Sequence, residues 1–293
     1  MEIKEQLLCK LDKESSEYIK RIANQSLFID YPFSIGICDS NTILFRATSH
    51  YPKDDLFRKK YVRYPSDLDK IELNRCNLPR QQIFYAAKTA EGALSEKSKC
   101  IRGEFNKPET IYLSRWVLLS DIFLVDFYFR TIESVKNENL QNYLLQRYND
   151  IKSNFSNYDQ IIKDLSFIGD KFAVNGDREY PFTALACNEI CRKVISGKKI
   201  SGITYTGTTY NHYFKRCLNN YTNLAVIPEL IEDESIILTD VIKLVIPPEI
   251  DFEIVEATEK TETIKDEIKL IDIDLLSDAR VNEIKEMLQN KQS

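Results

Sequence analysis

The sequence predicts an α+β fold, in which a mixed β-sheet core is flanked by helices. Apolar stretches of strand length and amphipathic stretches are both present, but they do not follow a strict strand–helix–strand alternation along the 293 residues. Apolar residues make up 43% of the chain and charged residues 29%, which is ordinary for a globular protein. Because the chain has only 8 glycines and 9 prolines, we expect no long disordered linker.

The first third of the chain predicts helices, a strand and a long loop. Residues 1–28 carry apolar side chains at helical spacing and are treated as an N-terminal helical segment. TILFRAT, at 42–48, is typical of a strand that ends near an arginine. The stretch at 54–82 is polar and irregular, as loops are. IFYAA, at 83–87, predicts another strand, and Thr89 is a candidate N-cap for a helix that follows it.

The middle of the chain predicts two strands at 110–129, followed by a pair of inserted helices at about 131–165. Residues 180–197 predict a helix, because Pro181 lies near its start and Gly197 just past its end. KISGITYT and TNLAVIPE predict two more strands. Beyond them, residues 235–259 predict a further pair of strands, and residues 277–292 an amphipathic helix.

Charge is distributed unevenly along the chain. From Glu229 onward there are 18 acidic and 7 basic residues, whereas the preceding part has 33 basic and 27 acidic residues. A basic body suits an anionic ligand, and an acidic tail argues against nucleic acid as a partner. Residues 231–293 are therefore treated as an acidic extension packed on the same domain. This extension either borders a partner-binding edge or simply adds strands and a helix.

The sequence lacks the features of several common classes of protein. No stretch is long and apolar enough for a membrane span, and the N-terminus does not resemble a signal peptide, so we expect a cytoplasmic protein. Seven cysteines without paired CxxC spacing fit reduced thiols, and two histidines leave little basis for a metal site or a Ser–His–Asp triad. There is no GxGxxG, P-loop or GxSxG motif. The remaining chemistry would depend on arginine, tyrosine, glutamate and hydroxyl groups.

Three segments, taken in order, resemble the RES-domain family. LFRAT contributes Arg46, NRCN contributes Arg75 and Asn77, and YAAKTAEGALSE contributes Tyr85 and Glu96. YPFTALACNEI, SGITYTGT and NLAVIPE resemble later segments of the family in the same order. The resemblance covers about residues 40–230, interrupted by the helical insert, and so places a RES-like catalytic domain at 29–230.

The resemblance implies an ADP-ribosyltransferase-like fold and NAD+ as substrate, with no separate cofactor. Members of the family cleave the nicotinamide–ribose bond, and the acceptor of ADP-ribose can be water, phosphate or a protein. Many members are toxins that pair with an antitoxin protein. The sequence is thus expected to encode a NAD+ glycohydrolase or ADP-ribosyltransferase, and the alternative is a catalytically silent nucleotide- or protein-binding module of the same fold.

The resemblance also implies roles for single residues. Glu96 would stabilise the positive charge that develops on the ribose, and Arg46 and Arg75 would bind the pyrophosphate. Tyr85 would offer its aromatic face to the nicotinamide. Asn77 is a further candidate for substrate binding. Where the family has Pro-Ser, this chain has Thr206-Gly207, so Thr206 and Thr208 are the candidates to supply the missing hydroxyl.

Overall fold

The structure is a computed structural model that describes residues 3–24, 35–49, 57–135, 138–174, 176–206, 210–211, 216–217, 222–247, 253–259 and 263–289. Its centre is one large mixed sheet. The strands of this sheet are, in spatial order, β1 (Ile35–Cys38), β6 (Ile122–Phe127), β8 (Lys198–Thr206), β11 (Thr222–Val226), β4 (Phe84–Ala87), β2 (Ile43–Thr48), β5 (Glu109–Leu118), β12 (Ile236–Ile246), β13 (Glu253–Ala257) and β15 (Ile271–Asp272). Along this path only β6 and β8 pair in parallel. The predicted α+β class is confirmed.

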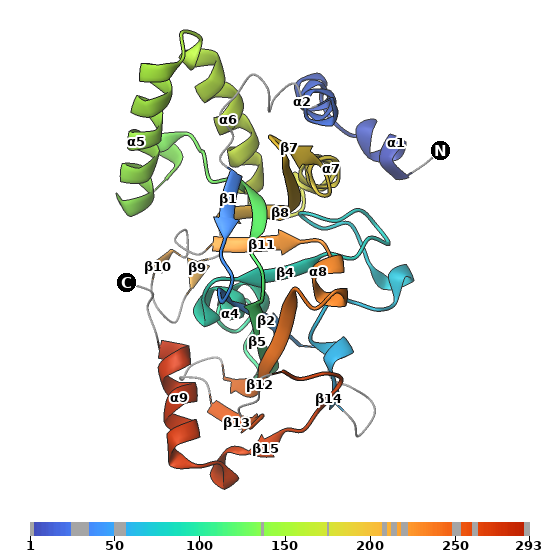
Figure 1. The fold of residues 1–293 in the computed structure, drawn as a ribbon, viewed down its shortest axis with the longest axis vertical. Helices are drawn as coiled ribbons and strands as arrows, with labels where there is room; N and C mark the ends of the chain where they lie inside the picture. Colours follow the sequence, from blue (N-terminus) through green and yellow to red (C-terminus); the bar gives the residue numbers. More distant parts are fainter. Residues whose placement is uncertain are drawn as a thin grey trace.

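The short strand β7 (Val194–Ile195) joins the same sheet by pairing with β8. Two separate strand pairs, β9 (Tyr210–Asn211) with β10 (Arg216–Cys217) and β3 (Phe57–Arg58) with β14 (Glu267–Ile268), and the helices surround the sheet (Figure 1). The α-helices are α1 (Ile3–Leu8), α2 (Lys13–Ala23), α4 (Ala90–Lys97), α5 (Glu138–Asn154), α6 (Tyr158–Phe172), α7 (Tyr180–Ile190), α8 (Glu229–Glu232) and α9 (Asp278–Gln289). Single 3-10 turns are η1 (Lys59–Tyr61), η2 (Leu68–Lys70), η3 (Ile132–Ser134) and η4 (Ile273–Leu275). None of the described helices has the length and apolar character needed to cross a membrane.

Three helices lie at the two ends of the molecule's long axis (Figure 1). The antiparallel pair α5 and α6 lies at one end of the long axis, and α9 lies at the other (Figure 1). The second inserted helix runs to Phe172, past the boundary at 165 that the sequence suggested. The acidic C-terminal part begins with α8 and then enters the sheet, because β12 is largely buried and lies between β5 and β13.

The end of the helix at 180–197 was predicted wrongly. Helix α7 ends at Ile190, and the residues before Gly197 form β7 instead of a last helical turn. Ser196 and Gly197 have φ angles of 50° and 76°, and they connect β7 to β8. Positive φ at both central residues is what a two-residue type I′ hairpin turn requires. Gly197 therefore serves a hairpin and not a helix end.

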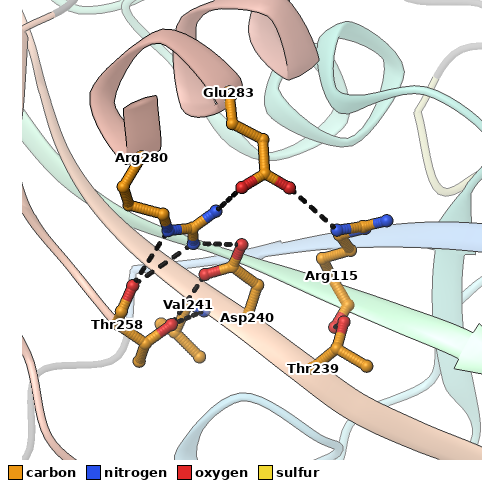
Figure 2. A network of polar contacts seen from close by, with 7 residues as sticks. All are labelled: Arg115, Thr239, Asp240, Val241, Thr258, Arg280 and Glu283. Atoms are coloured by element: carbon orange, nitrogen blue, oxygen red, sulfur yellow. Dashed lines mark hydrogen bonds and ion pairs between the residues drawn. The ribbon is translucent and has the colours of Figure 1, made fainter. Parts of the chain in front are cut away.

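The C-terminal helix α9 is attached by both apolar and charged contacts. Its Ile284 and Leu288 are buried in one cluster with Ala93 and Leu94 of α4. Figure 2 shows the charged part, in which the Arg280 guanidinium binds the Asp240 carboxylate of β12. The extension is thereby packed on the same body as the central strands, and it contacts the helix that carries Glu96.

Candidate active site

A cavity of about 370 Å³ is lined by residues of β2, β4, β8, β11, α4 and the start of α7. The described residues that line it are Phe45, Arg46, Ala47, Thr48, Asn74, Arg75, Tyr85, Ala86, Ala87, Ala93, Glu96, Lys97, Tyr180, Tyr205 and Asn223. Four of the predicted site residues are among them: Arg46, Arg75, Tyr85 and Glu96. Segments that are distant in the sequence therefore meet at the middle of the sheet.

Glu96 is placed by a tight strand-to-helix connection. Thr89 caps α4, because its side chain accepts a hydrogen bond of 3.0 Å from the Gly92 backbone N–H. Small residues such as Ala90 and Ala93 are buried between α4 and its neighbours, so the helix lies close to the sheet. Glu96, in the last turn, remains exposed and lines the cavity. A carboxylate is thus held at the cavity while the rest of the helix is packed.

Arg46 lies where β2 separates from β4. Among the described residues these strands pair at a single position, Phe45 with Ala87. The next side chain, Arg46, donates a hydrogen bond of 2.8 Å from Nη1 to the carbonyl oxygen of Tyr85, and its guanidinium lies 5.6 Å from the centre of the Phe84 ring. Burial lowers the pKa of Arg46 to about 10, so the side chain is still charged at neutral pH.

Arg75 is held by aromatic rings and by the end of an inserted helix. Its guanidinium lies 5.6 Å from the ring centres of both Tyr180 and Tyr205. Its Nη1 and Nη2 donate to the carbonyl oxygens of Phe172 and Val174, at the C-terminal end of α6. The negative end of a helix dipole favours a cation at this place. The helical insert thus contributes to the site, which the sequence did not suggest.

The cavity carries an excess of positive charge. Its charged lining residues, within the described part of the chain, are Arg46, Arg75, Lys97 and Glu96. Neither arginine forms an ion pair with a carboxylate among these residues, and the Nε of Arg46 is buried without a hydrogen-bond partner. Partial loss of hydration lowers the pKa of Lys97, and the positive charge of Arg46 lowers it further. Arginines bound only to carbonyl oxygens retain donors and charge for an anionic ligand.

Tyr85 and Asn77 support the segment that contains Arg75. The Tyr85 hydroxyl accepts a hydrogen bond of 2.8 Å from the Cys76 backbone N–H and donates one of 2.9 Å to Asn77 Oδ1. Burial raises the pKa of Tyr85 well above its ordinary value, which keeps the hydroxyl protonated. Asn77 is itself buried and is not among the described lining residues. Tyr85 lines the cavity, and its hydroxyl holds the segment that follows Arg75.

Neither threonine candidate, Thr206 or Thr208, is among the described residues that line the cavity. Thr206, the last residue of β8, is buried, pairs with Thr222 of β11 and is not among the described residues around the cavity. Thr208 lies outside the described residues. No hydroxyl from either residue is therefore assigned to the site.

Three residues that shape the cavity are not among the candidates that the sequence predicts. Tyr180 and Tyr205 enclose the Arg75 guanidinium, and Asn223 donates a hydrogen bond of 2.8 Å from Nδ2 to the Glu96 carboxylate. All three lie in segments that carried the later part of the family resemblance, YPFTALACNEI, SGITYTGT and NLAVIPE. The order of those segments was the available signal, but it did not indicate which side chain faces the cavity.

The cavity combines cationic, aromatic and acidic side chains. The arginines can bind phosphate groups, the aromatic rings offer flat apolar surfaces, and Glu96 provides one carboxylate. Within the described residues, no group of three or more histidine, cysteine, aspartate or glutamate side chains could hold a metal ion. Comparisons with family models, curated proteins and solved structures found no match to this chain.

Proposed function

We propose that this protein consumes NAD+ by cleaving the bond between nicotinamide and ribose. The observation that carries the proposal is the meeting of two arginines without acidic partners in the described residues, Arg46 and Arg75, with the exposed carboxylate of Glu96 in one cavity. The dianionic pyrophosphate of NAD+ matches the arginines. The ordered resemblance to RES-domain proteins supports the same substrate.

The proposed chemistry assigns one main task to each group. The C1′–N bond of the nicotinamide riboside breaks, its electron pair leaves with nicotinamide, and positive charge develops on the ribose ring. Glu96 stabilises this charge, because a fixed carboxylate close to an oxocarbenium-like ring interacts more strongly with the transition state than with the ground state. Arg46 and Arg75 hold the pyrophosphate, and Tyr85 provides an aromatic surface for nicotinamide. The acceptor, which is water, phosphate or a protein side chain, then donates an electron pair to C1′ and releases a proton to solvent where it carries one.

A direct test measures nicotinamide release from NAD+ by the wild type, Glu96→Gln and Glu91→Gln. Both glutamates are on α4, but only Glu96 is among the described residues that line the cavity. We expect Glu96→Gln to reduce the rate by about 100-fold or more and Glu91→Gln to leave it near that of the wild type. Equal rates in all three proteins would reject the proposal. Free ADP-ribose would identify water as the acceptor, and a labelled macromolecule would identify transfer.

One observation favours a second candidate, a nucleotide-binding module without turnover. Thr206, a candidate for the missing hydroxyl, is buried, pairs with Thr222 of β11 and is not among the described residues that line the cavity. Such a module would bind ADP-ribose and NAD+ by calorimetry but would release no nicotinamide. The two candidates therefore differ in turnover and not in binding.

A further inference from the structure

We propose that Asn223 is a bifunctional residue of the cavity: its Nδ2 positions Glu96, and its Oδ1 accepts a hydrogen bond from a hydroxyl of the ribose next to Glu96. Both halves of this inference rest on the proposed function, because the positioning role is measured through NAD+ turnover and the ribose contact names the part of NAD+ that this wall of the cavity recognises.

The position of Asn223 is fixed by the sheet. It lies on β11, between β8 and β4, where it pairs with Tyr205 on one side and Ala87 on the other. Asn223 is among the described residues that line the cavity, yet it is only 2% exposed. Because strands on both sides hold its backbone, the amide group has little freedom to follow a mobile ligand. It therefore acts as a preorganised group.

The N–H₂ group of the Asn223 amide already has a hydrogen-bond partner. Nδ2 donates a hydrogen bond of 2.8 Å to Oε1 of Glu96, whose side chain is otherwise exposed. A long, exposed side chain samples several rotamers, and a charge-assisted bond from a rigid donor restricts that freedom. Asn223 thus holds one carboxylate oxygen of Glu96 against the sheet. Within the described part of the chain only Oε1 of Glu96 has a side-chain partner, which leaves the other carboxylate oxygen for a ligand.

The other half of the amide has no partner among the described residues. Asn223 Oδ1 is buried and accepts no hydrogen bond. Buried acceptors are almost always satisfied in folded proteins, so an orphaned one at a cavity wall requires an explanation. Because Oδ1 and Nδ2 belong to the same amide, the orphaned acceptor lies beside the Glu96 contact. A ligand group that reaches Glu96 is therefore close to this acceptor.

The chemistry of this wall selects a hydrogen-bond donor. The carboxylate of Glu96 and the amide oxygen of Asn223 can only accept hydrogen bonds, so they disfavour phosphate and favour hydroxyl or N–H groups. The cationic wall, with Arg46 and Arg75, has the opposite preference. A ribose carries two neighbouring hydroxyls beside a pyrophosphate, which matches the two acceptors and the cations in one ligand. The carboxamide N–H₂ of nicotinamide is the competing donor.

Calorimetry with two nucleotides separates these possibilities. ADP-ribose contains the terminal ribose but no nicotinamide, and ADP lacks both. We expect Asn223→Ala to weaken ADP-ribose binding by about tenfold and to leave ADP binding within about twofold of the wild type. ADP is the control for folding, because a damaged cavity would weaken the binding of both nucleotides. Unchanged ADP-ribose affinity, or an equal loss for ADP and ADP-ribose, would overturn the ribose contact.

The positioning role has its own readout in Asn223→Asp. This variant keeps the shape of the side chain and an acceptor, but it replaces the donor to Glu96 by a second carboxylate. We expect kcat for NAD+ to fall by about tenfold or more while KM changes by less than threefold. The acid side of the pH–rate profile should also move to higher pH, because neighbouring carboxylates retain a proton more strongly than one alone. An unchanged pH profile with unchanged kcat would overturn this role.

Failure of the inference and failure of the proposed function remain distinguishable. If the wild type binds ADP-ribose in a manner that depends on Asn223 but releases no nicotinamide from NAD+, the ribose contact stands and the enzymatic proposal fails. If nicotinamide is released and Asn223→Ala affects neither binding nor turnover, the enzymatic proposal stands and the role of Asn223 fails.

Discussion

Arg280 of α9 and Asp240 of β12 form a buried ion pair that joins the acidic C-terminal helix to the sheet (Figure 2). Their side chains are only 8% and 2% exposed. Thr258 supports the pair, because its hydroxyl donates to Asp240 and its carbonyl oxygen accepts from Arg280. Glu283, on the next turn of α9, binds Arg280 as well. The Asp240 carboxylate therefore has its cationic partner only while α9 is packed against β12.

We expect Arg280→Met to lower the free energy of unfolding by about 3 kcal/mol, because Asp240 would remain buried without its cation. Denaturant unfolding would measure this change. Arg58→Met is the matched control. The side chains of Arg58 and Asp266 form an ion pair and are 46% and 68% exposed, so loss of this pair should lower the free energy of unfolding by about 0.5 kcal/mol or less. A double variant, Arg280→Met with Asp240→Leu, should recover part of the loss. Equal stability of Arg280→Met and the wild type would contradict the importance of the pair.

Arg75 should not tolerate replacement by lysine. Arg75→Lys keeps a positive charge but cannot donate to the Phe172 and Val174 carbonyls in the same way while lying between two aromatic rings. We expect ADP-ribose affinity to fall by about tenfold by calorimetry. Arg80→Lys is the control, because Arg80 is exposed and pairs with Asp69 at the surface. If both variants bind as the wild type does, Arg75 does not contact the ligand.

The hydroxyl and the ring of Tyr85 can be separated by mutation. Tyr85→Phe removes the partner of the Cys76 N–H and of Asn77 Oδ1 but retains the aromatic surface. We expect a loss of about 1–3 kcal/mol in the free energy of unfolding, with nicotinamide release reduced by less than tenfold in the folded protein. Tyr85→Leu, which removes the ring, should reduce turnover more strongly. Equal turnover in the two variants would argue against an aromatic contact with nicotinamide.

Tyr64 predicts a loss of stability at alkaline pH. Its side chain is 2% exposed and its hydroxyl donates to Glu232 over 2.9 Å; burial and this hydrogen bond raise the pKa of Tyr64 to about 12. The folded pKa thus lies above the value of about 10 for an unfolded chain. The resulting stability is fully present below pH 10 and is lost as the pH rises toward 12.

Thermal or denaturant unfolding between pH 9 and pH 12 would test this prediction. We expect the wild type to lose about 1–2 kcal/mol more than Tyr64→Phe over this interval, because phenylalanine cannot ionise. Parallel pH curves for the wild type and Tyr64→Phe would contradict the assignment.

Local patterns were sufficient for most of the elements. The apolar runs in TILFRAT and IFYAA predicted β2 and β4, and Thr89 caps α4 as expected, because these signals depend on neighbouring residues only. The failure at Gly197 had a physical cause. Glycine accepts positive φ equally well at a helix end and in a hairpin, so the residue type could not distinguish the two.

The sequence by itself predicted the α+β class and seven candidate site residues: Arg46, Arg75, Asn77, Tyr85, Glu96, Thr206 and Thr208. Only the tertiary structure decided that four of them, Arg46, Arg75, Tyr85 and Glu96, line one cavity, that the end of the inserted helix α6 holds Arg75, and that Asn223 binds Glu96. Strand order and helix docking bring together residues more than a hundred positions apart, as with Glu96 and Asn223. Such contacts depend on how whole faces are buried against one another, and no short stretch of sequence encodes that.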